Sequence, residues 1–167
     1  MDPQVAPLHV ILDLNTDLLL NCLDGLSDEE ARRQLAGGGN TIAFLAAHLT
    51  DTRHFLAHRL GHGIANPLSR YLAEASSIDD IVEWPTLQEQ REWWRAVSRH
   101  LARVLAARTP EDLRRPDVHR FPLGDSSELG MIAFLVQHDS YHIGQLGFLR
   151  RQLGKPAMAY VRGAGIG

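Results

Sequence analysis

The sequence predicts an all-α protein, a four-helix bundle with long connections. Four long stretches carry apolar side chains at helical spacing, and residues that typically begin or end helices flank them. We find no strand-rich segment, internal repeat or low-complexity block. Because amphipathic helices must bury their apolar faces, four of them in one chain predict a bundle. At 167 residues, we expect a single domain spanning residues 1–167.

The amino-terminal part of the chain predicts one long and one short helix. The first is expected from about Pro3 to Asp24, where apolar residues recur at helical spacing. Asn15 interrupts this apolar face, and we interpret it as a hydrogen-bonded core amide or a residue at the boundary of the core, rather than as part of a pocket. Residues 27–30 (SDEE) form a capping box that starts a short helix reaching about Leu35. The glycines that follow favour a turn over a phosphate-binding loop, since the lysine and preceding strand of such a loop are missing.

The second long helix is followed by the longest connection in the chain. This helix is expected to begin at a cap formed by Asn40 or Thr41 and to end at about Leu60. Residues 64–85 lack a long periodic element, although one short turn is expected near residues 78–82. A connection of this length can cross the bundle, so the next helix can run parallel to the second.

Two further long helices complete the predicted bundle. Residues 86–89 (TLQE) form a capping box that opens the third helix, which is expected to reach about Arg108. Residues 109–111 (TPE) start another helical segment and lead into a loop. The fourth helix is expected to begin at a cap formed by Asp125 and to stop at Gly154.

The fourth helix is expected to carry two histidines in the middle of its buried apolar stripe. His138 and His142 are four residues apart, so they project from the same side of a helix, one turn apart. A buried imidazole without a partner costs about 1 to 3 kcal/mol, so two such rings favour a shared partner. Neutral imidazole is a common zinc ligand and also suits nickel, copper and iron. The spacing therefore predicts a bound transition metal.

A third histidine, His48, lies in the apolar arc of the second helix. If the two helices face each other, three imidazoles meet and leave a position for water or substrate, as in catalytic zinc sites. Three other histidines on the second helix also have regular spacing, but we expect His54 and His58 to be solvated because they project outside the apolar arc. The alternative is that the inward histidines are packed core residues of a bundle without metal.

The composition argues against nucleic-acid and membrane partners and for a cytoplasmic location. A net charge of -3 offers no general attraction for nucleic acid or an anionic membrane surface, so we expect neither as a partner. Cys22 is the only cysteine and is interpreted as a small core residue, because it has no partner for an internal disulfide. The amino terminus has neither a basic region nor a long apolar run, so we expect a cytoplasmic protein.

Three stretches resemble the DinB-like (DinB/YfiT) family, and the similarity covers essentially the whole chain. They are NTIAFLAAHL (residues 40–49), HDSYHIGQL (residues 138–146) and LRRQLGKP (residues 149–156). The resemblance implies a four-helix bundle in which three histidines hold a divalent metal, usually zinc or nickel. The matching positions here are His48, His138 and His142. Family members often have another histidine just before the last one, where this chain has Asp139-Ser140-Tyr141.

The resemblance also implies a function. Characterised family members include transferases and isomerases that use low-molecular-weight thiols such as bacillithiol, mycothiol or glutathione, and members are often homodimers. We therefore expect a metal-dependent thiol S-transferase or hydrolase that acts on a small-molecule substrate, and no catalytic residue is assigned. The alternative is a non-catalytic protein that binds or senses a small ligand in the same metal pocket.

Polar side chains near the predicted site are assigned from helical position alone. Asp51 and Asp139 could support neighbouring groups, but we interpret both as surface residues. The candidates for lining a cavity are Thr52, Arg59, Tyr141 and Gln145, and the alternative for Arg59 is a position at the boundary of the core.

Overall fold

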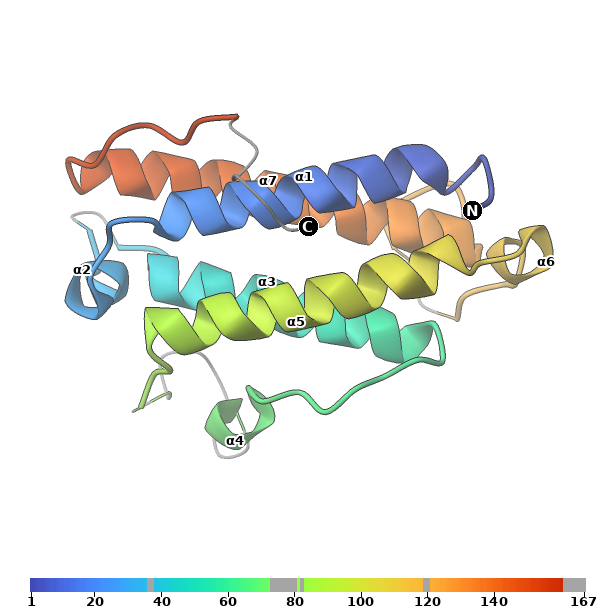
Figure 1. The fold of residues 1–167 in the computed structure, drawn as a ribbon, viewed down its shortest axis with the longest axis horizontal. Coiled ribbons are helices and arrows are strands. Elements are labelled where there is room, and N and C mark those ends of the chain that lie inside the picture. Colours follow the sequence, from blue (N-terminus) through green and yellow to red (C-terminus); the bar gives the residue numbers. More distant parts are fainter. Residues whose placement is uncertain (36–37, 73–80, 82, 119–120, 161–167) are drawn as a thin grey trace.

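Helices form nearly all the regular structure of the described residues, as predicted (Figure 1). The computed structural model describes residues 1–35, 38–72, 81, 83–118 and 121–160. Within them no strand is present apart from one isolated bridge, and no helix is long and apolar enough to span a membrane. The four long helices are α1 (Ala6–Leu23), α3 (Ile42–Arg59), α5 (Leu87–Ala106) and α7 (Glu128–Gln152), and the short ones are α2 (Asp28–Arg32), α4 (Ser69–Leu72) and α6 (Pro110–Leu113).

The long helices pack around the bundle in the order α1, α7, α3, α5. Helices α1 and α7 run in one direction, and α3 and α5 run in the other (Figure 1). The connection between α3 and α5 therefore returns along the bundle, as its length predicted, and α4 lies outside the ring of long helices. The turn expected near residues 78–82 falls almost entirely outside the described residues.

The start of α7 differs from the prediction. Ser127, and not Asp125, is its cap, because the Ser127 hydroxyl accepts a hydrogen bond from the backbone of Gly130. The Asp125 carboxylate instead accepts from the backbone N–H of Ser127 and so shapes the turn before the helix. The remaining predicted caps are confirmed, since a backbone N–H donates to the side chain of each of Ser27, Thr41, Thr86 and Thr109.

Two helices are shorter than predicted. Helix α1 begins at Ala6 rather than Pro3, with Pro7 in its first turn, where a missing N–H costs nothing. Helix α2 ends at Arg32 rather than about Leu35, because the backbone of Arg33 is extended.

Two apolar clusters fill the bundle, one toward α2 and one toward α6. The first includes Cys22 and Trp94, both completely buried, which confirms the interpretation of Cys22 as a core residue. The second includes Leu12, Leu56 and Leu105. Burial on this scale is the main favourable term in the stability of a bundle.

Arg53 of α3 joins all four long helices where the two clusters meet. Its guanidinium stacks on Trp94 of α5 at 3.6 Å and donates to the backbone oxygen of Leu12 in α1 at 3.2 Å. It also donates to the Asp139 carboxylate in α7 at 2.9 Å. Asp139 is only 2 % exposed, so its interpretation as a surface residue is wrong. The ion pair with Arg53 offsets the cost of burying the Asp139 carboxylate, so this carboxylate can lie in the core.

Candidate metal centre

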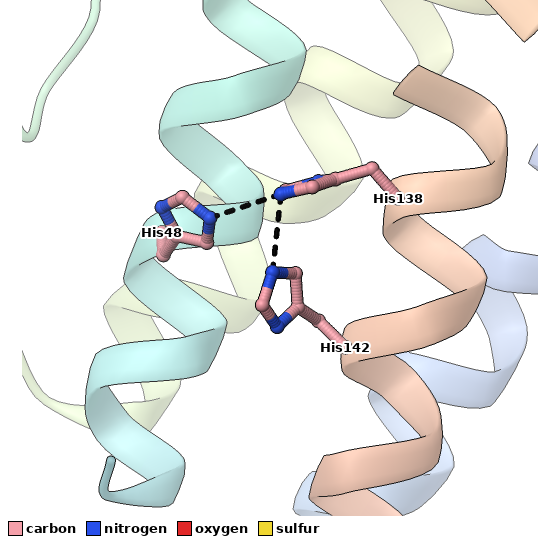
Figure 2. Close-up of side chains that lie close together, drawn as sticks. All are labelled: His48, His138 and His142. Atoms are coloured by element: carbon pink, nitrogen blue, oxygen red, sulfur yellow. Dashed lines mark hydrogen bonds between the residues drawn. The ribbon is translucent and has the colours of Figure 1, made fainter. Parts of the chain in front are cut away.

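The Nε2 atoms of His48, His138 and His142 converge between α3 and α7 (Figure 2). His138 Nε2 lies 3.2 Å from His48 Nε2 and 3.1 Å from His142 Nε2. One ring nitrogen from each histidine lies within 4.8 Å of the others. The structure thus brings together the three rings named from the sequence, and their role as metal ligands stays a prediction.

These separations suit a shared ion better than hydrogen bonds among the rings. A ring nitrogen carries either one proton or one lone pair, so His138 Nε2 cannot form two full hydrogen bonds. Two nitrogens bound to a tetrahedral ion at about 2.0–2.1 Å lie about 3.3 Å apart, close to the observed separations. Three imidazole nitrogens also match the ligand preferences of zinc, nickel, copper and iron. The donor set and its spacing therefore fit a divalent transition metal.

Burial keeps two of the rings uncharged at neutral pH. Desolvation, followed by the effect of the nearby His142, lowers the pKa of His48, and Asp51 partly opposes this. Desolvation and the two neighbouring imidazoles lower the pKa of His138 from 6.5 to about 4. A metal binds imidazole only through an unprotonated nitrogen, so this environment favours metal binding.

Gln145 determines the orientation of the His142 ring. Its Oε1 atom lies 2.6 Å from His142 Nδ1. An amide oxygen can only accept a hydrogen bond, so Nδ1 carries the proton and Nε2 directs its lone pair toward the other two rings. Gln145 was a cavity candidate from its helical position, and the structure shows it holding a candidate ligand in place.

The histidine pair lies at the edge of the buried face of α7, not in its middle. Asp139, Ile143 and Leu146, which are buried, lie about 80° to 140° around the helix from His138. The rings of His138 and His142 are only partly buried. Helical periodicity predicted the wrong centre for the buried face of α7, because Asp139 was taken as a surface residue and the two histidines as core residues. The consequence is a site open to ligands at the side of the bundle.

The other polar candidates do not converge on the three nitrogens. The Thr52 hydroxyl donates to the backbone oxygen of His48, and Arg59 pairs with Asp117 at 3.1 Å. The side chain of Tyr141 is 58 % exposed. Arg59 is the last residue of α3, about three turns from His48, so it lies away from the site. Tyr141 lies at the rim, with its ring centroid 5.1 Å from that of His142, and it lines a pocket together with Gln145, as predicted for both.

His54 is buried, contrary to the prediction that it is solvated. It is 6 % exposed, and burial lowers its pKa, which a hydrogen bond with the backbone of Ile64 partly opposes. The chain turns at Gly61, which has a φ of 77°, and folds back over this side of α3. His58 is exposed, as predicted. Among the described residues, only the three-histidine cluster has the spacing of a metal site.

Comparison with known proteins agrees with this fold. The sequence model described as the DinB superfamily matches residues 11–146, a range that contains all three histidines. A solved structure titled "Crystal structure of the conserved protein of locus from Enterococcus faecalis" matches with a TM-score of 0.75. The match covers 93 % of this chain and 99 % of that chain at 16 % sequence identity, which shows a shared fold alone. The comparison with curated proteins gave no match.

Proposed function

The chain belongs to the DinB superfamily, and from this premise we propose that it binds a divalent metal, zinc or nickel, through three histidines. The observation that carries the proposal is the convergence of Nε2 atoms from His48, His138 and His142. The lowered pKa values of His48 and His138 and the hydrogen bond from His142 to Gln145 support it, because they favour unprotonated nitrogens that face one point.

We further propose that the site serves a thiol S-transferase or a hydrolase reaction on a small molecule. When bound, a divalent ion held by three nitrogens supplies an open coordination position and lowers the pKa of a thiol or water placed there. The partial exposure of the three rings supports access for such a ligand. The choice of a low-molecular-weight thiol, such as bacillithiol, mycothiol or glutathione, rests on the resemblance to the family.

Elemental analysis of protein purified without chelator tests metal binding. We expect about one zinc or nickel ion per chain, and a large loss of metal in His142→Ala. His58→Ala is the matched control, because His58 is exposed on α3 away from the three nitrogens. Chelation should lower the melting temperature and metal addition should restore it, since a ligand of the native state stabilises that state. Unchanged metal content in His142→Ala would show that the ligand set is wrong.

Turnover assays on the metal-loaded protein test the reaction class. The protein is incubated with each thiol and a reactive aryl halide, or with an activated ester for hydrolysis. Metal-dependent product supports an enzyme. Saturable ligand binding without product supports the alternative of a non-catalytic binding or sensing protein.

We also propose that the protein works in the cytoplasm as a homodimer. Tyr141 and Phe148 are exposed apolar side chains seven residues apart on one face of α7, which favours a covered surface there. Light scattering at several concentrations should report a dimer, and Phe148→Glu should shift it toward monomer. A monomer at every concentration would contradict the dimer. The single buried thiol, Cys22, suits a reducing compartment.

A further inference from the structure

A groove of about 540 Å³ lies between the start of α3 and the carboxyl-terminal half of α7, next to the three histidines. Leu45 lines it on α3, about one turn before His48. Gln145 lines it on α7, about one turn after His142. The two helices run in opposite directions, so both residues lie on the same side of the histidines along the bundle (Figure 1). The groove therefore adjoins the candidate metal centre, and its volume is typical of small-molecule sites, about 300–1,000 Å³.

We propose that this groove binds an uncharged small molecule that carries a flat apolar ring and a carbonyl group. The ring lies over Gly144, between Tyr141 and Phe148, and the carbonyl oxygen accepts a hydrogen bond from Gln145. The inference rests on the proposed function, because it assigns a substrate class to the space beside the metal centre.

Gly144 leaves open space where another residue would place a side chain. Glycine is less favourable than alanine inside a helix, because its backbone loses more freedom. At Gly130, earlier in the same helix, packing explains the glycine, since a Cβ atom there would clash with the backbone oxygen of Asp125. A Cβ atom at Gly144 would meet no described atom within 4 Å, and the φ of Gly144 is not positive. Neither the packing nor the backbone of the described residues requires glycine at this position, which supports a role for the open space itself.

Two exposed aromatic side chains border this open space. Tyr141 and Phe148 project from one face of α7, about 10.5 Å apart along the helix axis. Gly144 lies between them, and all three residues line the groove. Leu45 and Leu149 add apolar side chains to the lining. Aromatic rings stack favourably with flat apolar groups, so this part of the groove suits a ring.

Gln145 contributes a hydrogen-bond donor to the groove. Its Oε1 atom lies 2.6 Å from His142 Nδ1 and accepts that proton, so its NH2 group is what remains for a ligand. No hydrogen bond among the described residues uses this NH2 group. A donor beside an apolar slot favours a ligand that has a carbonyl oxygen next to its ring.

The groove carries no charge of its own, since none of its lining residues is charged. The charges around it do not favour a cation. Arg151 is exposed near the end of α7, and Asp51 lies beyond the histidines on α3. Arg33, in the chain before residues 38–40 of the groove, is paired with Glu29 at 3.6 Å. The ion proposed on the three histidines adds positive charge that disfavours a cation, and an anion finds no charged partner in the lining, so an uncharged ligand fits best.

Three probes that share a benzene ring test the inference: phenylacetamide, ethylbenzene and phenethylammonium. Each is titrated into the full chain, with and without zinc, and followed by NMR of the Leu45 and Leu149 methyl groups. We expect saturable shifts with phenylacetamide, which should bind about three- to tenfold more tightly than ethylbenzene, the effect of one hydrogen bond. Phenethylammonium should bind no better than ethylbenzene. Equal or tighter binding of the cation than of phenylacetamide, or shifts that spare both leucines, would overturn the inference.

Gly144→Leu tests the open space directly, because the new side chain would fill the groove. We expect the shifts caused by phenylacetamide to be lost, and the melting temperature to stay the same or rise because leucine is the better helix former. Gly147→Ala is the matched control, since Gly147 is also in α7 but faces Met158 and does not line the groove. Unchanged binding of phenylacetamide in Gly144→Leu would contradict the inference. If this variant misfolds, the comparison of the three probes on the native chain still decides.

The oligomeric state and the metal content of the same samples separate this inference from the proposed function. Tyr141 and Phe148 also belong to the proposed dimer surface. A shift of Gly144→Leu from dimer to monomer without loss of phenylacetamide binding would assign the open space to a second copy of the chain and overturn the inference. Phenylacetamide binding in a protein that retains no metal would count against the metal centre and leave the groove supported. Full metal content without phenylacetamide binding would count against the groove alone.

Discussion

The Nε atom of Arg53 donates to Oδ2 of Asp139 at 2.9 Å, and both side chains are almost completely buried. Asp139 directly follows His138, and Arg53 lies in the same helix as His48. This ion pair therefore connects the two backbones that carry the candidate metal ligands. Helix α3 cannot slide along α7 without breaking it, so the pair constrains the register on which the separation of His48 and His138 depends.

Removing the carboxylate should strongly destabilise the protein. We expect Asp139→Ala to lower the free energy of unfolding by about 3–5 kcal/mol, because Arg53 keeps a buried charge without its partner. Urea denaturation measures the change. Glu29→Gln is the control, since it removes an exposed ion pair with Arg33 worth about 1 kcal/mol or less. Similar losses in the two variants would show that the buried pair contributes little.

Gln145 should matter for metal affinity more than for folding. We expect Gln145→Leu to weaken zinc binding about 10- to 100-fold, because the His142 ring loses the acceptor that holds its Nδ1 proton. Gln145→Glu keeps an acceptor and should restore most of the affinity. Competition with a chromophoric chelator gives the values. Gln137→Leu, at an exposed position of the same helix, is the control. An equal loss of zinc affinity in this variant would contradict the role of Gln145 in positioning His142.

The stability of the metal-free protein should fall in mild acid because of His138. Its pKa is about 4 in the native state against 6.5 for the ordinary side chain, so the unfolded chain takes up more protons between these values. The stabilisation is complete above about pH 6.5 and is lost as the pH falls toward 4. We expect a loss of about 1–2 kcal/mol, reduced from the full value because the ring is partly exposed. Urea denaturation between pH 4 and 6.5 should show that the free energy of unfolding of His138→Gln depends less on pH than that of the native sequence. An unchanged pH dependence would contradict the lowered pKa of His138.

Cys22 should be almost inert to alkylation in the native protein. Burial raises the pKa of its thiol to about 11, although Arg150 partly opposes the shift. The reactive thiolate is therefore about 100-fold scarcer at pH 8 than for an ordinary thiol. Mass spectrometry after iodoacetamide treatment should find slow modification that becomes fast in urea. Equal rates in both conditions would contradict the buried environment.

Local chemistry explains why much of the fold could be predicted. The caps at Ser27, Thr41, Thr86 and Thr109 form within a single turn, so short motifs report them directly. Helical spacing likewise places His138 and His142 on one side of α7 without any knowledge of the remaining chain. The number of long helices and the direction of α5 follow from the same local patterns and from the length of one connection.

The burial of particular polar side chains could not be predicted without the tertiary structure. Asp139 is a core residue because its partner, Arg53, lies 86 positions away in the sequence, and His54 is covered because the chain folds back after Gly61.

The sequence alone determined the helices, the family resemblance and the identity of the three histidines. Only the packing decided that their Nε2 atoms meet at the edge of the bundle, where a ligand can reach them. The physical reason is that helical periodicity is set by the backbone of one segment, whereas the cost of burying a charge depends on what a distant segment places beside it.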